Sequence, residues 1–353
     1  MAVKSVYADC AASCPVHPVA MEAFIRAAGT MFEPSVMPIQ YANPNSVHTL
    51  GRESRKALEQ ARETVARCIN AKPDQIAFTP SATSACRTAL DLFDYRHPFT
   101  TYDCSLYEHK AVWGYLSDET DDDPVDGCYA HMLANNETGE RYDTIVRDLA
   151  KDNVVFCDAT AAVGQIPVDV QWLGVHALAA GAHKFGGFPG IGFLYLKDGI
   201  TDEATFPGTP PVALAVAMAN ALAYRTAHMT EANTYLMEQT ERLAKAILDI
   251  PGAHINTPMD RRLPNILSVR LDGVNARELL TMLDVNGVYA SAGSACTADS
   301  DEPSRVLLAS GLTEEQALST IRLSFCPETT PAEFRRTAGA LRRCVTQLRS
   351  LNK

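Results

Sequence analysis

Three stretches of this sequence place chemically useful side chains directly after segments that read as β-strands. Asp158 ends the apolar run "NVVFCD", and Lys184 follows "VHALAAGAH" and precedes a glycine-rich turn. Thr83 lies in "FTPSATS", where a strand pattern gives way to a helix. The carboxyl ends of parallel strands form the usual ligand crevice of an open α/β sheet, so these side chains are candidates for one site.

Each stretch alone has a plainer interpretation: a helix cap at Thr83, a capping carboxylate at Asp158, a surface lysine at Lys184. Taken together, the three stretches predict a cofactor site. A helix N-terminus with a hydroxyl suits a phosphate, and a lysine held away from bulk water can form a Schiff base. An aspartate can protonate a pyridine nitrogen. This set, in this order, matches the needs of pyridoxal phosphate.

A fourth candidate is a thiol in an unusual setting. Cys296 lies in "YASAGSACTADSDEPSRVL", among small and polar residues, whereas a structural cysteine normally has apolar neighbours. The plain interpretation is an exposed loop that happens to carry a cysteine. The alternative is a reactive thiol on a mobile loop.

Alternating strands and helices must position these residues. "SRKALEQARETVARCI" has apolar residues at helical spacing (Ala57, Leu58, Ala61, Val65, Ile69), and "DQIAFTP" reads as the next strand. "SATSACRTALDLF" reads as a helix, whereas "NVVFCDAT", "VHALAAGAHK" and "IGFLYLK" read as buried strands. This order predicts a mainly parallel sheet covered by helices.

The C-terminal part has a different pattern. "NILSVRLDG" and "TIRLSF" read as strands on either side of the helix "ARELLTMLDVNG". The last helix has an apolar stripe made of Phe334, Ala338, Leu341, Val345 and Leu348. We therefore expect a large cofactor-binding domain over residues 13–232. We also expect a small α+β domain that consists of residues 233–353 together with residues 1–12 and carries the Cys296 loop.

Composition narrows the class of protein. The chain has 353 residues and a net charge of −11, which argues against nucleic acid or an anionic membrane as the main partner. No signal-peptide pattern or membrane-length apolar run is present, so we expect a cytoplasmic protein whose ten cysteines are mostly packed thiols. Cys10 and Cys14 form the only close pair and signal a metal site weakly.

The sequence as a whole resembles the class V, fold-type I pyridoxal-phosphate enzymes, and among them the cysteine desulfurases of the NifS/IscS type. The resemblance runs nearly end to end. The matching stretches are "YADCAASCPV", "YANPNSVHTLGRESRKALEQAR", "IAFTPSATS", "YEHKAV", "NNETG", "VFCDATAAVGQIPVDV", "GAHKFGGFPGIGFLYL", "LPNILSVRL", "SAGSACT" with "EPSRVL", and "TIRLSF". The His-Lys pair and the Gly-Ser-Ala-Cys-Thr loop are the most specific of them.

The resemblance implies a role for each matching residue. Lys184 would carry the cofactor, Asp158 would bind its ring nitrogen, and His109 would stack on the ring and carry protons. Implied phosphate ligands are Ala82, Thr83 and His183, with Thr209 reaching the phosphate of a neighbouring subunit, which implies a homodimer. Asn136 would lie near the phenolic oxygen and the substrate, with Arg322 and Asn43 also binding substrate, and no metal is implied.

Cys296 would be the nucleophile. The implied reaction converts L-cysteine to L-alanine and leaves a persulfide on Cys296, from which sulfur passes to an acceptor protein such as an iron–sulfur scaffold. A thiol that must reach a buried cofactor and then a second protein needs a mobile loop, which is what the small and polar neighbours of Cys296 permit.

The match has departures at the cofactor. Ala161 replaces the family's glutamine, Gly181 replaces its serine, and Ser81 stands in the cradle where glycine is usual. Three alternatives stay open. One is another enzyme of this cofactor class, such as an aminotransferase or a selenocysteine or cysteine-sulfinate lyase, and one is a non-catalytic partner in sulfur trafficking. The third is metal binding by Cys10, Cys14 and Cys326.

Overall fold

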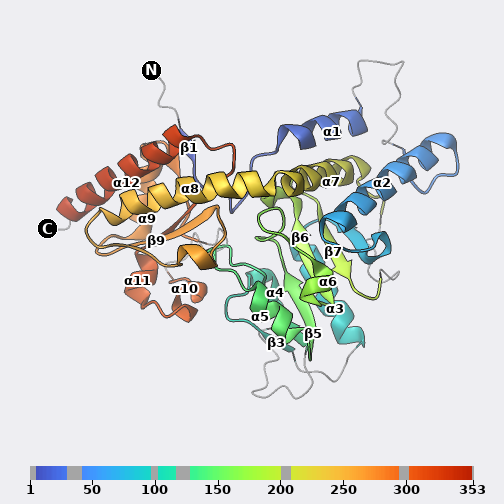
Figure 1. Ribbon diagram of the computed structural model, residues 1–353, viewed down its shortest axis with the longest axis horizontal. Helices are drawn as coiled ribbons and strands as arrows, with labels where there is room; N and C mark the ends of the chain where they lie inside the picture. Colours follow the sequence, from blue (N-terminus) through green and yellow to red (C-terminus); the bar gives the residue numbers. More distant parts are fainter. Residues whose placement is uncertain are drawn as a thin grey trace. The chain divides into compact units, whose positions relative to one another are not determined.

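The protein was analysed as a computed structural model that describes residues 5–29, 42–96, 102–116, 128–199, 208–293 and 302–351 (Figure 1). Packing divides the chain into two compact units. The large unit comprises Pro15–Leu133 and Tyr142–His228, and the small unit comprises Met1–Cys14, Ala134–Arg141 and Met229–Lys353. The architecture is α/β, as the sequence predicts.

The large unit is built on a six-stranded sheet in the order β2-β7-β6-β5-β4-β3. Four neighbouring strands, β3 to β6, are parallel, whereas β7 is antiparallel to both β6 and β2. The strands are β2 (Ile76–Thr79), β3 (Tyr102–Cys104), β4 (Cys128–Ala130), β5 (Val154–Asp158), β6 (Ala177–Gly181) and β7 (Gly192–Leu196). The predicted strands at β2, β5, β6 and β7 are confirmed.

Helices cover the sheet because its strands are apolar on both faces. Helices α3 (Ala82–Arg96) and α4 (Lys110–Leu116) share a buried cluster with alternate strand residues such as Phe156, Ala179 and Leu194. Helices α1 (Pro18–Ala28), α2 (Thr49–Cys68) and α7 (Val212–Ala227) pack side by side (Figure 1). Two short helices, α5 (Asp143–Leu149) and α6 (Val170–Leu173), complete the unit.

The predicted apolar stripe of α2 is confirmed, since Ala57, Leu58, Ala61, Val65 and Ile69 are all buried. The helix begins at the residue after His48, whose Nδ1 accepts the N–H of Gly51 at 3.1 Å. Side-chain acceptors of this kind satisfy a backbone donor that the first helical turn leaves without an intrahelical partner.

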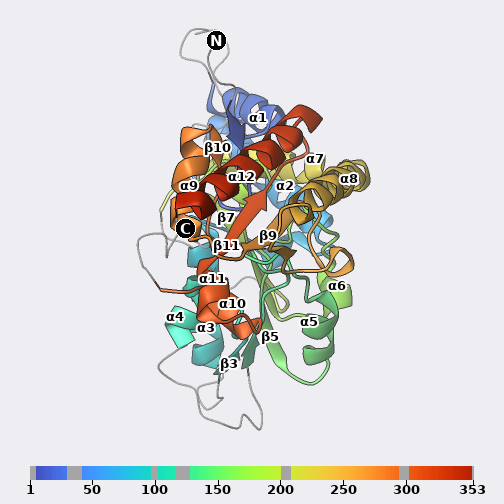
Figure 2. The ribbon, with the colours of Figure 1, turned by 90° about the vertical axis from the view of Figure 1, so that its left-hand side faces the viewer.

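The small unit contains the antiparallel sheet β11-β9-β8 and a parallel pair, β1 and β10 (Figure 2). The strands are β1 (Val6–Tyr7), β8 (Ala253–Ile255), β9 (Ile266–Leu271), β10 (Val288–Tyr289) and β11 (Thr320–Ser324). The helices are α8 (Met229–Leu248), α9 (Ala276–Val285), α10 (Arg305–Ala309), α11 (Glu314–Leu318) and α12 (Pro331–Leu351). Four of the five residues predicted for the apolar face of α12 are buried, and Ala338 is half-buried.

The helical run that ends the large unit divides at His228, which separates α7 from α8. The sequence places domain boundaries at residues 13 and 232. Packing also assigns Ala134–Arg141, the segment that contains "NNETG", to the small unit. Among the described residues, no helix is both long and apolar enough to cross a membrane.

Candidate active site

The predicted cofactor residues of the large unit lie at the carboxyl ends of its parallel strands. Asp158 is the last residue of β5, and its neighbour in the sheet is Ala179 of β6. Lys184 ends the single turn of 3-10 helix, Ala182–Lys184, that follows β6. His109 directly precedes α4 and accepts the N–H of Val112 through its carbonyl oxygen. This edge is where ligands bind in open α/β sheets.

Electrostatics tie His109 to the other two residues. Burial lowers the pKa of His109, the charge of Asp158 opposes this effect, and the charge of Lys184 adds to it. The imidazole is therefore neutral near pH 7. Its Nδ1 accepts the N–H of Ala111 at 3.1 Å, so the ring proton of the neutral form lies on Nε2. His109 thus has one defined nitrogen with which to hold or pass a proton.

The start of α3 forms an anion cradle. Ser81 accepts the N–H of Ser84 at its Oγ and the N–H of Ala85 at its carbonyl oxygen, both at 3.1 Å. Helix geometry leaves the N–H groups of Ala82 and Thr83 without intrahelical acceptors, and Thr83 is exposed. Such N–H groups, with a hydroxyl beside them, are suited to a phosphate.

The cradle meets the end of β6 at close range. A Cβ added to Gly181 would lie 3.2 Å from both the Cβ of Ala82 and the Cε1 of His183. Burial, reinforced by the charge of Lys184, lowers the pKa of His183 to about 4, so this ring is neutral at pH 7 and can still hydrogen-bond a phosphate oxygen. A side chain at Gly181 would therefore crowd Ala82 and His183.

These residues fit pyridoxal phosphate. The large unit provides the donors of a phosphate cradle, a carboxylate that is 6% exposed, a lysine and a neutral histidine at one strand edge. Asp158 is already held by a local turn, because its Oδ1 accepts the N–H of Thr160 at 2.9 Å. The second carboxylate oxygen is available for a ring nitrogen.

Two supporting residues of Lys184 were not predicted from the sequence. Gln165 is buried, and its Nε2 donates to the carbonyl oxygen of Lys184 at 3.3 Å. Gly164 has a φ of +77°, and a Cβ there would lie 2.6 Å from the Cβ of Phe185. The motif "AAVGQIP" contains both residues, but only the fold shows that Gln165 bonds the backbone of Lys184 and that Gly164 packs against Phe185.

The small unit holds a second group of predicted residues around Arg322, in the middle of β11. Its side chain is 2% exposed. Arg322 donates from Nη2 to the Oδ1 of Asp9 at 2.6 Å and from Nη1 to the carbonyl oxygen of Asn136 at 2.8 Å. The Nε of Arg322 is buried and has no hydrogen-bond partner among the described residues. A buried guanidinium with a remaining donor is suited to bind a carboxylate. Asp9 was not predicted as a site residue.

The "NNETG" turn that carries Asn136 is fixed from within. The Oδ1 of Asn135 accepts the N–H groups of Glu137 and Thr138 at 2.8 and 2.9 Å. Gly139 has a φ of +77° and packs against Ile266, where a Cβ would approach the side chain to 3.1 Å. Asn136 is therefore held on a rigid turn next to the guanidinium of Arg322.

Glu137 contacts both sides of the stretch that carries the predicted nucleophile. Ser304 donates from Oγ to the Oε2 of Glu137 at 2.6 Å, and a Cβ at Gly293 would lie 2.7 Å from the same oxygen. Burial raises the pKa of Glu137, whereas the Ser304 hydrogen bond and the charges of Arg322 and Arg305 lower it. Cys296 itself lies outside the described residues.

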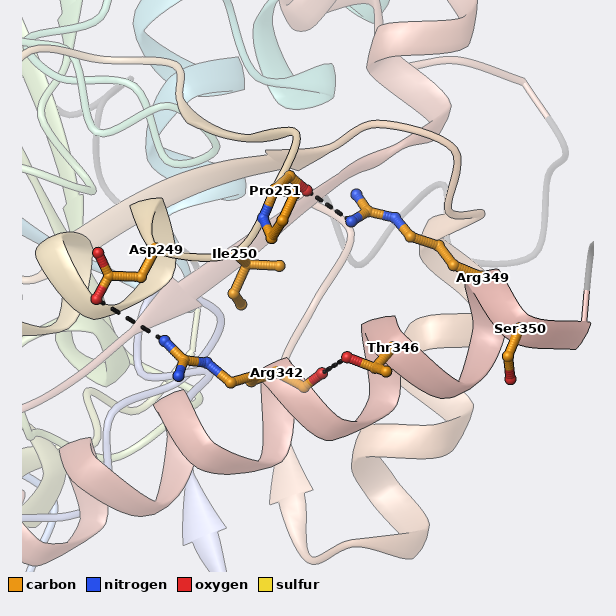
Figure 3. A pocket seen from close by; sticks show the side chains of 7 residues that line it. All are labelled: Asp249, Ile250, Pro251, Arg342, Thr346, Arg349 and Ser350. Carbon is orange, nitrogen blue, oxygen red and sulfur yellow. Dashed lines mark hydrogen bonds and ion pairs between the residues drawn. The ribbon is translucent and has the colours of Figure 1, made fainter.

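The two remaining predicted residues lie together in the large unit. The Nδ2 of Asn43 donates to the Oγ1 of Thr209 at 3.4 Å, and both side chains are exposed. Thr209 also lines a cavity of about 760 Å³ between α2, β2 and residues 208–211. A second cavity, of about 450 Å³ in the small unit, is lined by no predicted site residue (Figure 3).

Comparison with known proteins agrees with the fold and with the predicted cofactor. A family model described as class V aminotransferase matches residues 30–116, 128–206 and 201–336. The cysteine desulfurase IscS of Dictyoglomus turgidum is 31% identical over 99% of this chain and 96% of that protein. The IscS of Methanosarcina thermophila is 29% identical over 99% of this chain and 94% of its own length.

Solved structures show the same likeness. A NifS-like protein superposes with a TM-score of 0.82 at 27% identity and covers 98% of this chain and 100% of its own. SspA, solved in complex with cysteine, has a TM-score of 0.74 at 25% identity over 92% of this chain and 100% of its own.

The fold and the cofactor residues therefore define a pyridoxal-phosphate enzyme, and the chain belongs to the class V aminotransferase family. Within that family its full-length relatives are cysteine desulfurases, and the chain is a pyridoxal-phosphate-dependent cysteine desulfurase of the IscS type. The match spans the whole chain, in agreement with the resemblance in the sequence.

Proposed function

We propose that this enzyme takes sulfur from L-cysteine onto Cys296 and then passes it to an acceptor protein. In this proposal the large unit holds the cofactor through Lys184, Asp158 and the cradle at Ala82 and Thr83. The small unit provides Arg322, Asn136 and the reactive thiol. The single observation that carries the proposal is the arrangement of Lys184, Asp158 and His109 at one strand edge.

Bound pyridoxal phosphate would supply an electron sink that stabilises negative charge at the substrate's α-carbon. Asp158 would keep the ring nitrogen protonated, since a buried carboxylate pairs favourably with a cation. Neutral His183 would donate to a phosphate oxygen together with the hydroxyl and N–H groups at the start of α3. Together these residues would hold the cofactor at several points, beside His109.

Arg322 would orient the substrate. Asp9 and the Asn136 carbonyl oxygen occupy both terminal nitrogens of the guanidinium and hold its plane, while the buried Nε remains available to a carboxylate. Asn43 would add a further contact to the substrate. Fixing the carboxylate sets which bond of the α-carbon faces the cofactor ring.

Proton movement would fall to Lys184 and His109. The amine of Lys184 would take the α-proton of L-cysteine while it is deprotonated, and in its protonated form it would return that proton. His109 holds its proton on Nε2, where it can exchange with the substrate amine or thiol. The Cys296 thiolate would attack the substrate sulfur, and the C–S bond would break with its electron pair going to the β-carbon, which takes up a proton. Alanine would then be released, and the persulfide would remain on Cys296.

A homodimer is part of the proposal, because Thr209 and Asn43 are exposed as a hydrogen-bonded pair that a second subunit could use. The acceptor would be a protein that builds iron–sulfur clusters or carries sulfur in a related pathway, as the names of the IscS relatives suggest. We place this activity in the cytoplasm.

The direct test is to compare the purified protein with Lys184→Ala and with a matched control, Lys197→Ala, which lies just beyond β7. The native protein and Lys197→Ala should show a visible absorbance band with added cofactor and should form alanine from L-cysteine. Lys184→Ala should not show the absorbance band at the wavelength seen in the native protein and should not form alanine. Alanine production by Lys184→Ala at the native rate would refute the proposed role.

A further inference from the structure

Three thiols that the proposed function does not use meet in the small unit, and one of them, Cys10, directly follows Asp9 in the sequence. Cys10 and Cys14 lie on the N-terminal segment, and Cys326 lies two residues beyond β11. The thiol of Cys10 is hydrogen-bonded to the thiols of both Cys14 and Cys326, and Cys326 is also hydrogen-bonded to Cys14. The three sulfur atoms therefore form one mutually contacting group, and all three cysteines are free thiols.

The backbone holds this group in place. The N–H of Cys10 donates to the carbonyl oxygen of Ser324 at 3.2 Å, and the N–H of Ala11 donates to the Oγ of Ser324 at 2.9 Å. On the other side, the N–H of Cys326 donates to the Oγ1 of Thr329 at 3.3 Å. The thiols thus meet because two segments far apart in the sequence are bonded to each other, not because one loop carries them.

The three thiols differ in access and in acidity. Cys10 and Cys14 are 3% and 6% exposed, whereas Cys326 is only half-buried. Hydrogen bonds from Cys10 and then from Cys14 lower the pKa of Cys326, against the effect of burial. The hydrogen bonds to Cys14 and Cys326, followed by burial, raise the pKa of Cys10. Cys326 is therefore the most accessible of the three thiols and has a lowered pKa, and Cys10 is a buried thiol in contact with it.

We propose that Cys326 and Cys10 form a thiol–disulfide exchange site, separate from the Cys296 nucleophile, that reacts with low-molecular-weight disulfides of the glutathione type. The half-buried thiolate attacks and the buried thiol resolves, which is the division of roles that exchange requires. Cys14 is a positioning residue that stabilises the thiolate by a hydrogen bond.

The reaction balances in two steps. The Cys326 thiolate attacks one sulfur of glutathione disulfide, forms a mixed disulfide and releases one glutathione thiolate. Cys10 then loses its proton to that leaving thiolate and attacks the Cys326 sulfur, which releases the second glutathione. Two protein thiols are oxidised to one disulfide, and one glutathione disulfide is reduced to two glutathione molecules.

A metal site is the competing interpretation of three cysteines. Among the described residues, no group of three or more potential ligands is arranged to hold an ion. The geometry therefore favours exchange chemistry, and metal binding becomes an outcome of the test.

The experiment uses full-length holoprotein carrying Cys296→Ser, so that the loop thiol cannot exchange. The protein is equilibrated with glutathione and glutathione disulfide at a series of ratios, alkylated under denaturing conditions, digested and analysed by mass spectrometry. A peptide that joins Cys10 to Cys326 should grow with the disulfide fraction, while the buried Cys157 stays a thiol. Metal content is measured on the same preparation before equilibration.

Variants make the result specific. Adding Cys326→Ser should abolish the linked peptide, whereas Cys14→Ser should retain it and form it several-fold more slowly, because the thiolate loses one hydrogen bond. Absence of the linked peptide in excess glutathione disulfide would overturn the proposal. A disulfide that joins Cys10 only to Cys14 would also overturn it, as would stoichiometric zinc or iron that is lost in Cys10→Ser.

Discussion

Replacing Asp9 with asparagine should destabilise the protein more than any exposed charge change, because Asp9 is the charged partner of a buried arginine. The Arg322 side chain is 2% exposed and the Asp9 side chain 22%, with 2.6 Å between Nη2 and Oδ1. Removing one partner of a buried ion pair typically costs about 3–5 kcal/mol. Because Asp9 keeps some exposure, we expect a loss at or just below the lower end of that range, about 2–3 kcal/mol.

The assay is urea unfolding of Asp9→Asn, which keeps the size of the side chain and removes its charge. Asp249→Asn is the matched control. Asp249 pairs with Arg342 at 3.8 Å, and these side chains are 75% and 57% exposed (Figure 3). Exposed pairs contribute about 0–1 kcal/mol, so the control should change little. Equal losses in the two variants would refute the argument that burial makes the Arg322 pair important.

Three further predictions concern supporting residues. Burial raises the pKa of Glu137, so the free energy of unfolding should fall as pH rises from about 4.5 through that raised value. Urea unfolding of Glu137→Gln, which cannot ionise at this position, should not show that fall. The pKa of His183 is lowered to about 4, so the cofactor-free protein should lose stability as pH falls from about 6.5 to 4, less so in His183→Gln. Gly164→Ala should lower the free energy of unfolding by about 2–4 kcal/mol, because backbone strain at φ +77° adds to a 2.6 Å contact with Phe185. The control Gly273→Ala, at φ +73° with nothing within 4 Å, should lower it by about 1 kcal/mol. Thermal unfolding measures both variants.

Periodicity and strand–turn patterns were sufficient to predict most of the fold. The helix at residues 54–69 and the strand ending at Asp158 are confirmed because burial imposes a regular pattern on each of them. Partners across long sequence distances could not be predicted in this way. Asp9 meets Arg322 only because the N-terminal segment is bonded to the end of β11.

The same limit applies around the cofactor lysine. Lys184 was recognised from its place between a strand and glycines, but Gln165 carries no local signal that it donates to the lysine's carbonyl oxygen. Burial of Glu137, and its contact with Ser304, likewise depend on how the "NNETG" turn packs in the small unit. Sequence patterns therefore predicted the strands and turns that carry the candidate residues better than the residues that hold those candidates in place.

The most direct test of the account is alanine formation from L-cysteine, with added pyridoxal phosphate and a reductant, by the native protein and by Cys296→Ser. The account predicts alanine from the native protein and almost none from the variant, with sulfur recovered as a persulfide on Cys296. Equal alanine from both proteins would contradict it, because the reaction would then proceed without the loop thiol.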